Sequence, residues 1–235
     1  MPSLARPLLL AARARERYER LRGRSPEPRE ALIRRLAPGR RWLDVGCMWG
    51  IDGALCFVAE EAGAREVTGV DVMDATPAFR AQHAHQRSAV RFVRGDVNDP
   101  GLLEAVGVHD VVFCAGLLYH APDPVATVGR LAALTGELLV LGCETLPEVP
   151  GLPGACVFYP ALDAPARAGY RQSGPRERVG LDGPFDPARG YENWWWGPTP
   201  TALEGMIRSV GLEPMQRRTA GTATIVVATR GSGRG

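Results

Sequence analysis

From residue 41 onward, short apolar segments alternate with amphipathic ones, and this alternation limits the possible folds more than any other feature of the chain. Strands are expected at Arg41–Val45, Glu66–Val72, Val90–Arg94, Asp110–Cys114 and Glu137–Cys143. Helices are expected between them, at Ile51–Ala62, Pro77–His85, Gly101–Val106 and Pro124–Ala133. Strands that alternate with helices form a parallel sheet that is covered on both faces.

The pattern also suggests how the 235 residues are divided. Helices over 8–22 and 28–37 place an N-terminal helical cap at 1–40, before the core at 41–145. The alternation lapses over 146–197 and resumes at 198–235 with a helix over Thr199–Val210 and closing strands over Leu212–Arg217 and Thr222–Thr229. Proline and glycine are frequent in 146–197, and a loop that long in a compact domain is usually functional. We therefore expect 146–192 to act as a lid that becomes ordered when the substrate binds.

The charge pattern bears on possible partners. All 28 basic side chains are arginines, and residues 1–41 carry 12 of them against 4 glutamates, so the rest of the chain is acidic. A basic arm can bind nucleic acid, but its basic and acidic residues alternate, which favours a solvated helical cap. We do not expect nucleic acid as a partner. The sequence does not indicate an oligomeric state.

Composition also excludes several classes of protein. No apolar run approaches the roughly 18 residues of a membrane span, and the apolar run near the N-terminus is shorter than the roughly 7–15 residues of a secretory signal. We therefore expect a cytoplasmic protein without membrane association. No two of the five cysteines have C-x-x-C spacing, and we expect neither a metal site nor a redox role.

Candidate ligand groups follow three successive strands. The first strand runs into the glycine turn Gly46–Gly50, the second ends at Asp71, and the third leads into Gly95-Asp96-Val97. Open parallel sheets bind ligands outside the carboxyl ends of their strands. A carboxylate at Asp71 can accept both hydroxyls of a ribose, and one at Asp96 can accept the amino group of an adenine.

The ligand could be a dinucleotide or a nucleoside without phosphate. The dinucleotide fingerprint G-x-G-x-x-G needs a middle glycine so that the pyrophosphate can approach. Met48 occupies that position, and we expect its side chain to narrow this space. A nucleoside ligand such as S-adenosylmethionine would tolerate it.

The segments LDVGCMWG, VTGVDV and RGDVND, in this order, resemble the first three motifs of class I S-adenosylmethionine-dependent methyltransferases, although Met48 departs from the usual glycine. The resemblance implies a Rossmann-like α/β fold with a seven-stranded sheet, to which the residue pattern adds an N-terminal helical cap and a lid-like insertion. It also implies that Asp44 and the Gly46–Gly50 backbone hold the methionine end of the cofactor. The cofactor-binding residues implied in this way are Asp44, Gly46, Cys47, Gly50, Asp71, Val72, Asp96, Val97 and Cys114.

Two further segments narrow the resemblance. The segments Gly116-Leu117-Leu118-Tyr119-His120 and Asn193-Trp194-Trp195-Trp196-Gly197-Pro198-Thr199 resemble the branch that contains the tRNA wobble-uridine carboxymethyltransferases. We do not expect the long N-terminal extension of that branch here, because about 40 residues precede the first expected strand. We expect Asp123 to cap the next helix. The expected catalytic residues are His120, as general base, and Tyr119. The expected substrate-binding residues are Tyr119, His120, Tyr191, Asn193, Trp194, Trp195 and Trp196.

The sequence favours methyl transfer from S-adenosylmethionine to oxygen or nitrogen of a small molecule. The lysine-free composition suits a GC-rich bacterium and the tailoring of a specialised metabolite, such as an antibiotic. Two alternatives stay open. They are a tRNA wobble-uridine methyl or carboxymethyl transferase, and a non-catalytic protein that binds the cofactor.

Overall fold

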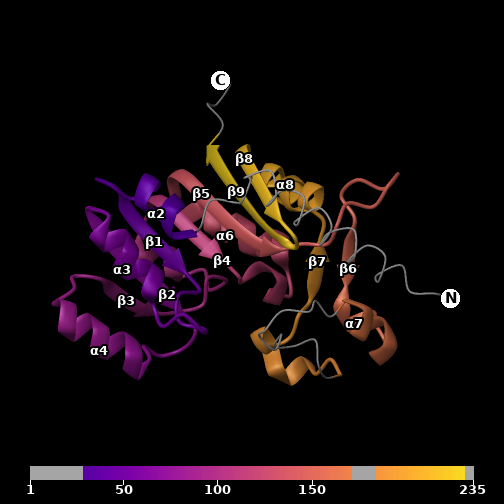
Figure 1. Ribbon diagram of the computed structural model, residues 1–235, viewed down its shortest axis with the longest axis horizontal. Helices are drawn as coiled ribbons and strands as arrows, with labels where there is room; N and C mark the ends of the chain where they lie inside the picture. The colour runs from indigo at the N-terminus through magenta and orange to yellow at the C-terminus, as the bar shows by residue number, and fades with distance from the viewer. Residues whose placement is uncertain (1–28, 171–183, 231–235) are drawn as a thin grey trace.

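The computed structural model describes residues 29–170 and 184–230, so the helix expected over 8–22 lies outside the described residues. Seven strands form one sheet in the order β3-β2-β1-β4-β5-β9-β8 (Figure 1). The strands of this sheet are β1 (Arg41–Val45), β2 (Glu66–Asp71), β3 (Arg91–Arg94), β4 (His109–Ala115), β5 (Thr135–Glu144), β8 (Leu212–Ala220) and β9 (Ala223–Arg230). The first five pair in parallel, and β9 enters antiparallel to both β5 and β8. This confirms the expected α/β fold with its seven-stranded sheet.

Helices cover both faces of the sheet. They are α2 (Arg29–Leu36), α3 (Ala54–Glu61), α4 (Pro77–Gln86), α5 (Leu102–Val106), α6 (Pro124–Leu134) and α8 (Pro200–Ser209). Side chains of α2, α3 and α4 pack in one apolar cluster with Trp42, whereas those of α5, α6 and α8 pack in another with Leu43. Because successive strand residues point to opposite faces, β1 anchors both clusters. The helix α2 belongs to the packed layer of the sheet, since Leu32, Ile33 and Leu36 are buried there.

Local sequence signals set the ends of several helices. Asp123 caps α6, as expected, and its side chain accepts a hydrogen bond from the Ala126 N–H at 3.0 Å. Thr199 caps α8 in the same way. The helix α3 begins at Ala54, three residues later than expected. Asp52 and Gly53 have φ near +50° and +70°, in the left-handed region, and so cannot continue a right-handed helix.

The segment between β5 and α8 contains some regular structure of its own. Its elements are β6 (Cys156–Phe158), the 3₁₀ helix η2 (Tyr159–Ala161), α7 (Ala164–Tyr170), the 3₁₀ helix η3 (Pro187–Glu192) and β7 (Trp196–Pro198). The strands β6 and β7 form a two-stranded antiparallel sheet beside the main one (Figure 1). Another 3₁₀ helix, η1 (Leu118–His120), follows β4. Within the described residues, no helix is both long enough and apolar enough to cross a membrane.

Candidate cofactor and acceptor site

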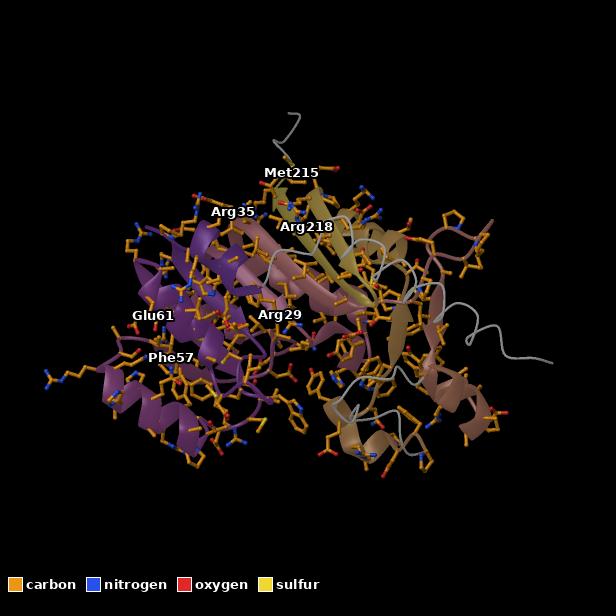
Figure 2. The ribbon with its side chains drawn as sticks, in the orientation of Figure 1. Arg29, Arg35, Phe57, Glu61, Met215 and Arg218 are labelled. Carbon is orange, nitrogen blue, oxygen red and sulfur yellow. The ribbon has the colours of Figure 1, made fainter. Side chains whose placement is uncertain are left out.

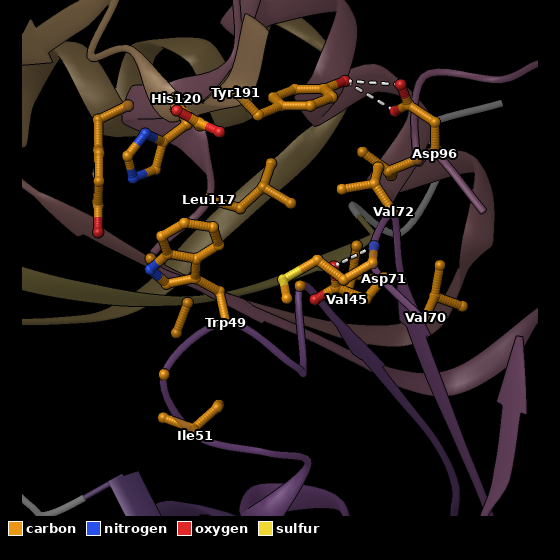
Figure 3. A pocket seen from close by; sticks show the side chains of 18 of the residues that line it. Val45, Trp49, Ile51, Val70, Asp71, Val72, Asp96, Leu117, His120 and Tyr191 are labelled. Atoms are coloured by element: carbon orange, nitrogen blue, oxygen red, sulfur yellow. Dashed lines mark hydrogen bonds between the residues drawn. The ribbon is translucent and has the colours of Figure 1, made fainter. Parts of the chain in front are cut away.

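A cavity of about 560 Å³ lies at the carboxyl ends of the parallel strands, where the sequence places the candidate groups (Figure 3). Its walls come from the turn after β1, from the ends of β2, β3 and β4, from η1, and from the segment that carries η3. The lining residues include Arg29, Gly46, Trp49, Gly50, Asp71, Val72, Asp96, Val97, Tyr119, His120, Glu144, Tyr191, Glu192 and Trp194. The volume falls within the range of small-molecule sites.

The glycine turn follows β1 directly. Gly46 has φ near +80° and Gly50 near +67°, a conformation that other residues rarely adopt. The N–H of Gly46 donates to the carbonyl oxygen of Val70 at 2.8 Å, which ties the turn to β2. A Cβ on Gly46 would stand 3.2 Å from Leu117 Cδ1. The turn therefore needs glycine both for its backbone angles and for its closeness to the segment after β4.

Met48 does not narrow the cavity, and that expectation is wrong. Its side chain is completely buried in the cluster that contains α3 and α4, and it is absent from the lining. Its φ is negative, so a methionine fits where related motifs carry glycine. The side chain that faces the cavity belongs to the next residue, Trp49, which the sequence analysis did not single out.

Asp71 lines the cavity at the end of β2. Its Oδ2 accepts a hydrogen bond from the Met48 N–H at 2.8 Å, and its Oδ1 accepts one from the Met73 N–H at 2.9 Å. Each carboxylate oxygen can accept about two hydrogen bonds, so both can still accept one from a ligand. Val72 lies beside it and also lines the cavity.

Asp96 lies at the other end of the cavity and already bonds a residue of the insertion. The Tyr191 hydroxyl donates to Asp96 at 2.7 Å from Oδ1 and 2.9 Å from Oδ2 (Figure 3). The Asn98 side-chain amide donates to the same hydroxyl at 2.7 Å, and its Oδ1 accepts from the Thr127 hydroxyl. Burial raises the pKa of Tyr191 to about 12 and the neighbouring carboxylate adds to this, so the phenol stays a donor.

Three of the expected cofactor residues do not line the cavity. Asp44, Cys47 and Cys114 are each 2% exposed or less. Asp44 lies beneath the glycine turn, where the Cys56 thiol donates to its Oδ2 at 3.5 Å. Burial raises the pKa of Asp44 to about 7. These residues support the turn and the strands from behind, and the structure places no side chain of theirs at the cavity surface.

His120 lines the cavity at the end of η1, and its orientation is fixed from behind. Its Nδ1 lies 2.9 Å from the carbonyl oxygen of Asn193, so this nitrogen carries the proton and donates. Its Nε2 has no hydrogen-bond partner among the described residues. Burial lowers the pKa of His120 below its usual value of 6.5. The imidazole is therefore neutral at pH 7, with a lone pair on Nε2.

The three adjacent tryptophans have different roles. Trp194 is buried, lines the cavity and packs against Tyr119, with ring centroids 4.3 Å apart and ring planes tilted by 36°. Trp195 donates from Nε1 to the Gly190 carbonyl, and Trp196 donates from Nε1 to the Pro122 carbonyl, and neither lines the cavity. Asn193 is buried, and its amide donates to the carbonyls of Asp186 and Gly190. Its contact with His120 is made by its backbone carbonyl, which accepts the hydrogen bond from Nδ1.

Some lining residues were missed by the sequence analysis. Glu144 ends β5, and its position at the carboxyl end of a strand is the same local signal that marks Asp71. Arg29 extends from the start of α2 toward the middle of the molecule (Figure 2), and no local pattern marks it. Its positive charge favours ionisation of Asp44, so the two side chains lie in each other's electric field. The described residues hold no cluster of side chains suited to a metal ion.

Comparisons with known proteins agree with this arrangement. Residues 43–135 match the family described as a methyltransferase domain. The chain is 29% identical over 181 residues to a ubiquinone biosynthesis O-methyltransferase of Bordetella avium, covering 77% of this chain and 65% of that enzyme. An enzyme of the same name from Acinetobacter baumannii is 30% identical over 128 residues, covering 53% of this chain and 45% of its own length. The chain thus spans less than two thirds of the length of these relatives.

Solved structures share the fold. An O-methyltransferase family protein from Burkholderia thailandensis aligns with a TM-score of 0.60 at 20% identity, over 94% of this chain and 60% of that chain. The 1,6-didemethyltoxoflavin-N1-methyltransferase of the same species, solved with its substrate and S-adenosylhomocysteine, aligns with a TM-score of 0.55 at 18% identity, over 98% and 92% of the two chains. Residues 43–135 are thus similar to a methyltransferase domain, and the chain shares the fold of these solved methyltransferases.

Proposed function

We propose that this protein transfers a methyl group from S-adenosylmethionine to a hydroxyl oxygen of a small molecule, with His120 as the general base. The observation that carries this proposal is the state of His120. It is neutral, it is held by the Asn193 carbonyl through Nδ1, and it lines the same cavity as the strand-end carboxylates.

The cavity suits a cationic nucleoside. The lining contains four carboxylate side chains and one guanidinium among the described residues: Asp71, Asp96, Glu144, Glu192 and Arg29. S-adenosylmethionine carries a sulfonium and an ammonium group, and it supplies an electrophilic methyl group when bound. A dinucleotide would instead bring an anionic pyrophosphate, which helix N-termini usually hold. Here the first residues of α3 do not line the cavity, so that contact is missing.

Each part of the cofactor has a matching group in this proposal. Asp71 accepts hydrogen bonds from the ribose hydroxyls through the lone pairs that the backbone leaves unused. Asp96 and the backbone of Val97 hold the adenine. The Gly46–Gly50 backbone approaches the methionine end, and Arg29 pairs with its carboxylate.

The base determines which acceptors are favoured. A hydroxyl acceptor must lose its proton during transfer, whereas a neutral amine needs only to be positioned. His120 can take that proton at Nε2, and the resulting imidazolium is stabilised by donation from Nδ1 to the Asn193 carbonyl. Tyr119 packs against the imidazole at 4.4 Å between ring centroids and limits its rotation. The sequence relatives, which are O-methyltransferases by name, also favour oxygen.

In this proposal the acceptor is a specialised metabolite that is modified in the cytoplasm. The lysine-free composition is what supports a GC-rich bacterial source. The resemblance to the tRNA wobble-uridine branch extends to the Gly116–His120 and Asn193–Thr199 segments, which meet where the Asn193 carbonyl holds His120. We assign that shared layout to the reacting end of the site and not to tRNA recognition.

The test compares wild-type protein with His120→Ala, using labelled S-adenosylmethionine and a panel of phenols, alcohols and amines. Turnover of the best hydroxyl acceptor should fall about 10²–10⁴-fold, the usual effect of losing a general base. The affinity for S-adenosylhomocysteine should stay within about twofold. His85→Ala is the matched control, because His85 is exposed on α4 and does not line the cavity.

The pH profile provides an independent measurement. Wild-type kcat/KM should rise with pH through one pKa below 6.5 and then level off, since burial lowers the pKa of His120. His120→Ala should lose this limb. A fall in turnover of less than about threefold would make His120 a packing residue and favour an amine acceptor. Collapse of cofactor binding in the variant would make the η1 segment structural.

A further inference from the structure

Trp49 is unusual among the large apolar side chains of this protein. It lies within the glycine turn, lines the cavity and is 56% exposed. It makes no hydrogen bond and no ring contact with any described residue. By contrast, Met48 beside it is completely buried. The turn thus buries the Met48 side chain and exposes the Trp49 indole to the cavity.

The indole lies at the reacting end of the cavity. In the view of Figure 3, it extends from the glycine turn toward His120 and Leu117, whereas Asp96 and the Tyr191 hydroxyl lie at the opposite end. The adenine end of the proposed cofactor is therefore distant from Trp49. The indole instead lies where a methyl acceptor must approach the base.

A second aromatic surface lines the same end from another part of the chain. Tyr119 and Trp194 pack with ring centroids 4.3 Å apart and ring planes tilted by 36°. The backbone N–H of Trp195 donates to the Tyr119 carbonyl at 2.8 Å, which fixes one segment against the other. His120 lies against both rings, 4.4 Å from Tyr119 and 5.9 Å from Trp194 between centroids. Aromatic pairs in offset-stacked or edge-to-face geometry are stabilised beyond the burial of their surface.

We propose that Trp49 is a specificity residue that forms one wall of a slot for a flat, aromatic acceptor, with Tyr119 and Trp194 on the other side. This inference rests on the proposed function, since it concerns the acceptor of the same site. A ring between these walls would cover the exposed indole and present a ring hydroxyl to Nε2 of His120. A puckered ring of the same size would fit the slot less well, because it is thicker and has no π-face to pair with the indole.

The experiment measures binding, so it does not depend on turnover. Full-length protein saturated with S-adenosylhomocysteine is titrated by calorimetry with naphthalene-2,3-diol and with trans-decalin-2,3-diol. The two diols have the same carbon skeleton size and the same hydroxyl spacing along it, but only the first is flat. Wild-type protein should prefer the flat diol. Trp49→Ala should reduce that preference about 3- to 10-fold, which is the range for an aromatic pair, and Trp49→Phe should keep most of it.

Phe158→Ala is the control for removal of an exposed aromatic ring. Phe158 is 41% exposed and does not line the cavity, so the preference should not change. The inference is wrong if wild-type protein binds neither diol or both equally, or if Trp49→Ala keeps the full preference. Weaker binding of S-adenosylhomocysteine by Trp49→Ala would also overturn it, by placing Trp49 in the cofactor site. If wild-type protein does not bind S-adenosylhomocysteine, the proposed function itself fails.

Discussion

Single residues at this site have both a structural role and a proposed role in binding. Asp71 accepts hydrogen bonds from the backbone N–H groups of Met48 and Met73, and so holds the glycine turn against β2. The same carboxylate lines the cavity. Its exposure is only 6%, so a ligand would meet a carboxylate that is already desolvated and oriented. A hydrogen bond is electrostatically stronger in such a buried position than in water.

Asp71→Ala should remove most of the affinity for S-adenosylmethionine. Loss of a carboxylate that accepts two ribose hydroxyls should cost about 2–4 kcal/mol, because hydrogen bonds to charged groups contribute about 1.5–3 kcal/mol each and do not add fully. Calorimetric titration measures this loss. Asp74→Ala is the control, since Asp74 is exposed, pairs with Arg94 at 3.2 Å and does not line the cavity. Wild-type affinity in Asp71→Ala would remove the ribose role.

Asp44 should make the stability of the protein depend on pH. Burial raises the pKa of its carboxyl from 3.8 to about 7, so the folded state keeps a proton that the unfolded state has lost. The resulting stability is fully present below pH 3.8 and is lost as the pH rises to about 7. At about 1.4 kcal/mol for each pKa unit, the loss is on the order of 4 kcal/mol.

Asp44→Asn should abolish this loss, because asparagine does not titrate. Urea unfolding at pH 5 and pH 8 measures the effect. From pH 5 to pH 8, the free energy of unfolding of the wild type should fall by about 2–3 kcal/mol relative to that of the variant. Asp74→Asn, at an exposed position, should follow the wild type. Equal pH dependence in wild type and Asp44→Asn would show that Asp44 is ionised in the folded protein at neutral pH.

At the scale of elements, the insertion is joined to the core by side chains and not only by its two ends. The η3 segment reaches Asp96 and Asn98 through the Tyr191 hydroxyl, and it reaches His120 through the Asn193 carbonyl. These contacts span 73 to 95 positions of sequence. They attach the η3 segment, which forms one wall of the cavity, to the residues that follow β3 and β4.

Tyr191→Phe should loosen the η3 segment without changing the core. The variant loses a donor to Asp96 and an acceptor for Asn98, which should lower the local opening free energy by about 1–2 kcal/mol. Hydrogen exchange over residues 186–196 should therefore become about 5- to 30-fold faster, while exchange in α4 stays the same. Unchanged exchange at 186–196 would show that packing, and not this hydroxyl, holds the segment.

The proposed role of the insertion as a lid predicts a further change. In the wild type, exchange over residues 146–192 should slow when cofactor and acceptor are both bound, because the acceptor would contact Trp194 and fill the space beneath η3. The same exchange rate with and without ligands would contradict a lid and favour a rigid wall.

At the scale of the whole molecule, the distribution of charge favours a small-molecule substrate over tRNA. The chain carries 28 arginines against 26 acidic residues, and the arginines concentrate in residues 1–41. The cavity itself, within the described residues, has more carboxylates than cations. Binding of RNA depends on basic contacts to phosphate and falls steeply with salt.

We expect bulk tRNA to bind only at the non-specific level, with a Kd of about 10⁻⁴–10⁻⁶ M at physiological salt. Fluorescence anisotropy with labelled tRNA at 50 and 200 mM salt measures both the affinity and its salt dependence. A Kd well below 10⁻⁶ M at the higher salt concentration would revive the tRNA alternative. It would also place the acceptor outside the class proposed above.

Much of the fold was predictable because its signals are local. The alternation of strands and helices depends on the spacing of apolar residues along a few turns, and the glycine turn depends on backbone angles that only Gly46 and Gly50 adopt easily. Parallel strands end at the same edge of a sheet, so Asp71 and Asp96 could be placed at one cavity without knowing any contact between them.

The sequence by itself thus determined the order of the elements, the edge of the sheet that carries the site and the residues at the strand ends. Only the tertiary structure decided which side chains face the cavity. Met48 packs inward among side chains of α3 and α4, and Trp49 lies at the surface of the turn. Asp44 is buried and accepts a hydrogen bond from the Cys56 thiol, and His120 is oriented by a carbonyl 73 residues away. Such choices depend on what packs behind each residue, and those neighbours come from distant segments that no local pattern identifies.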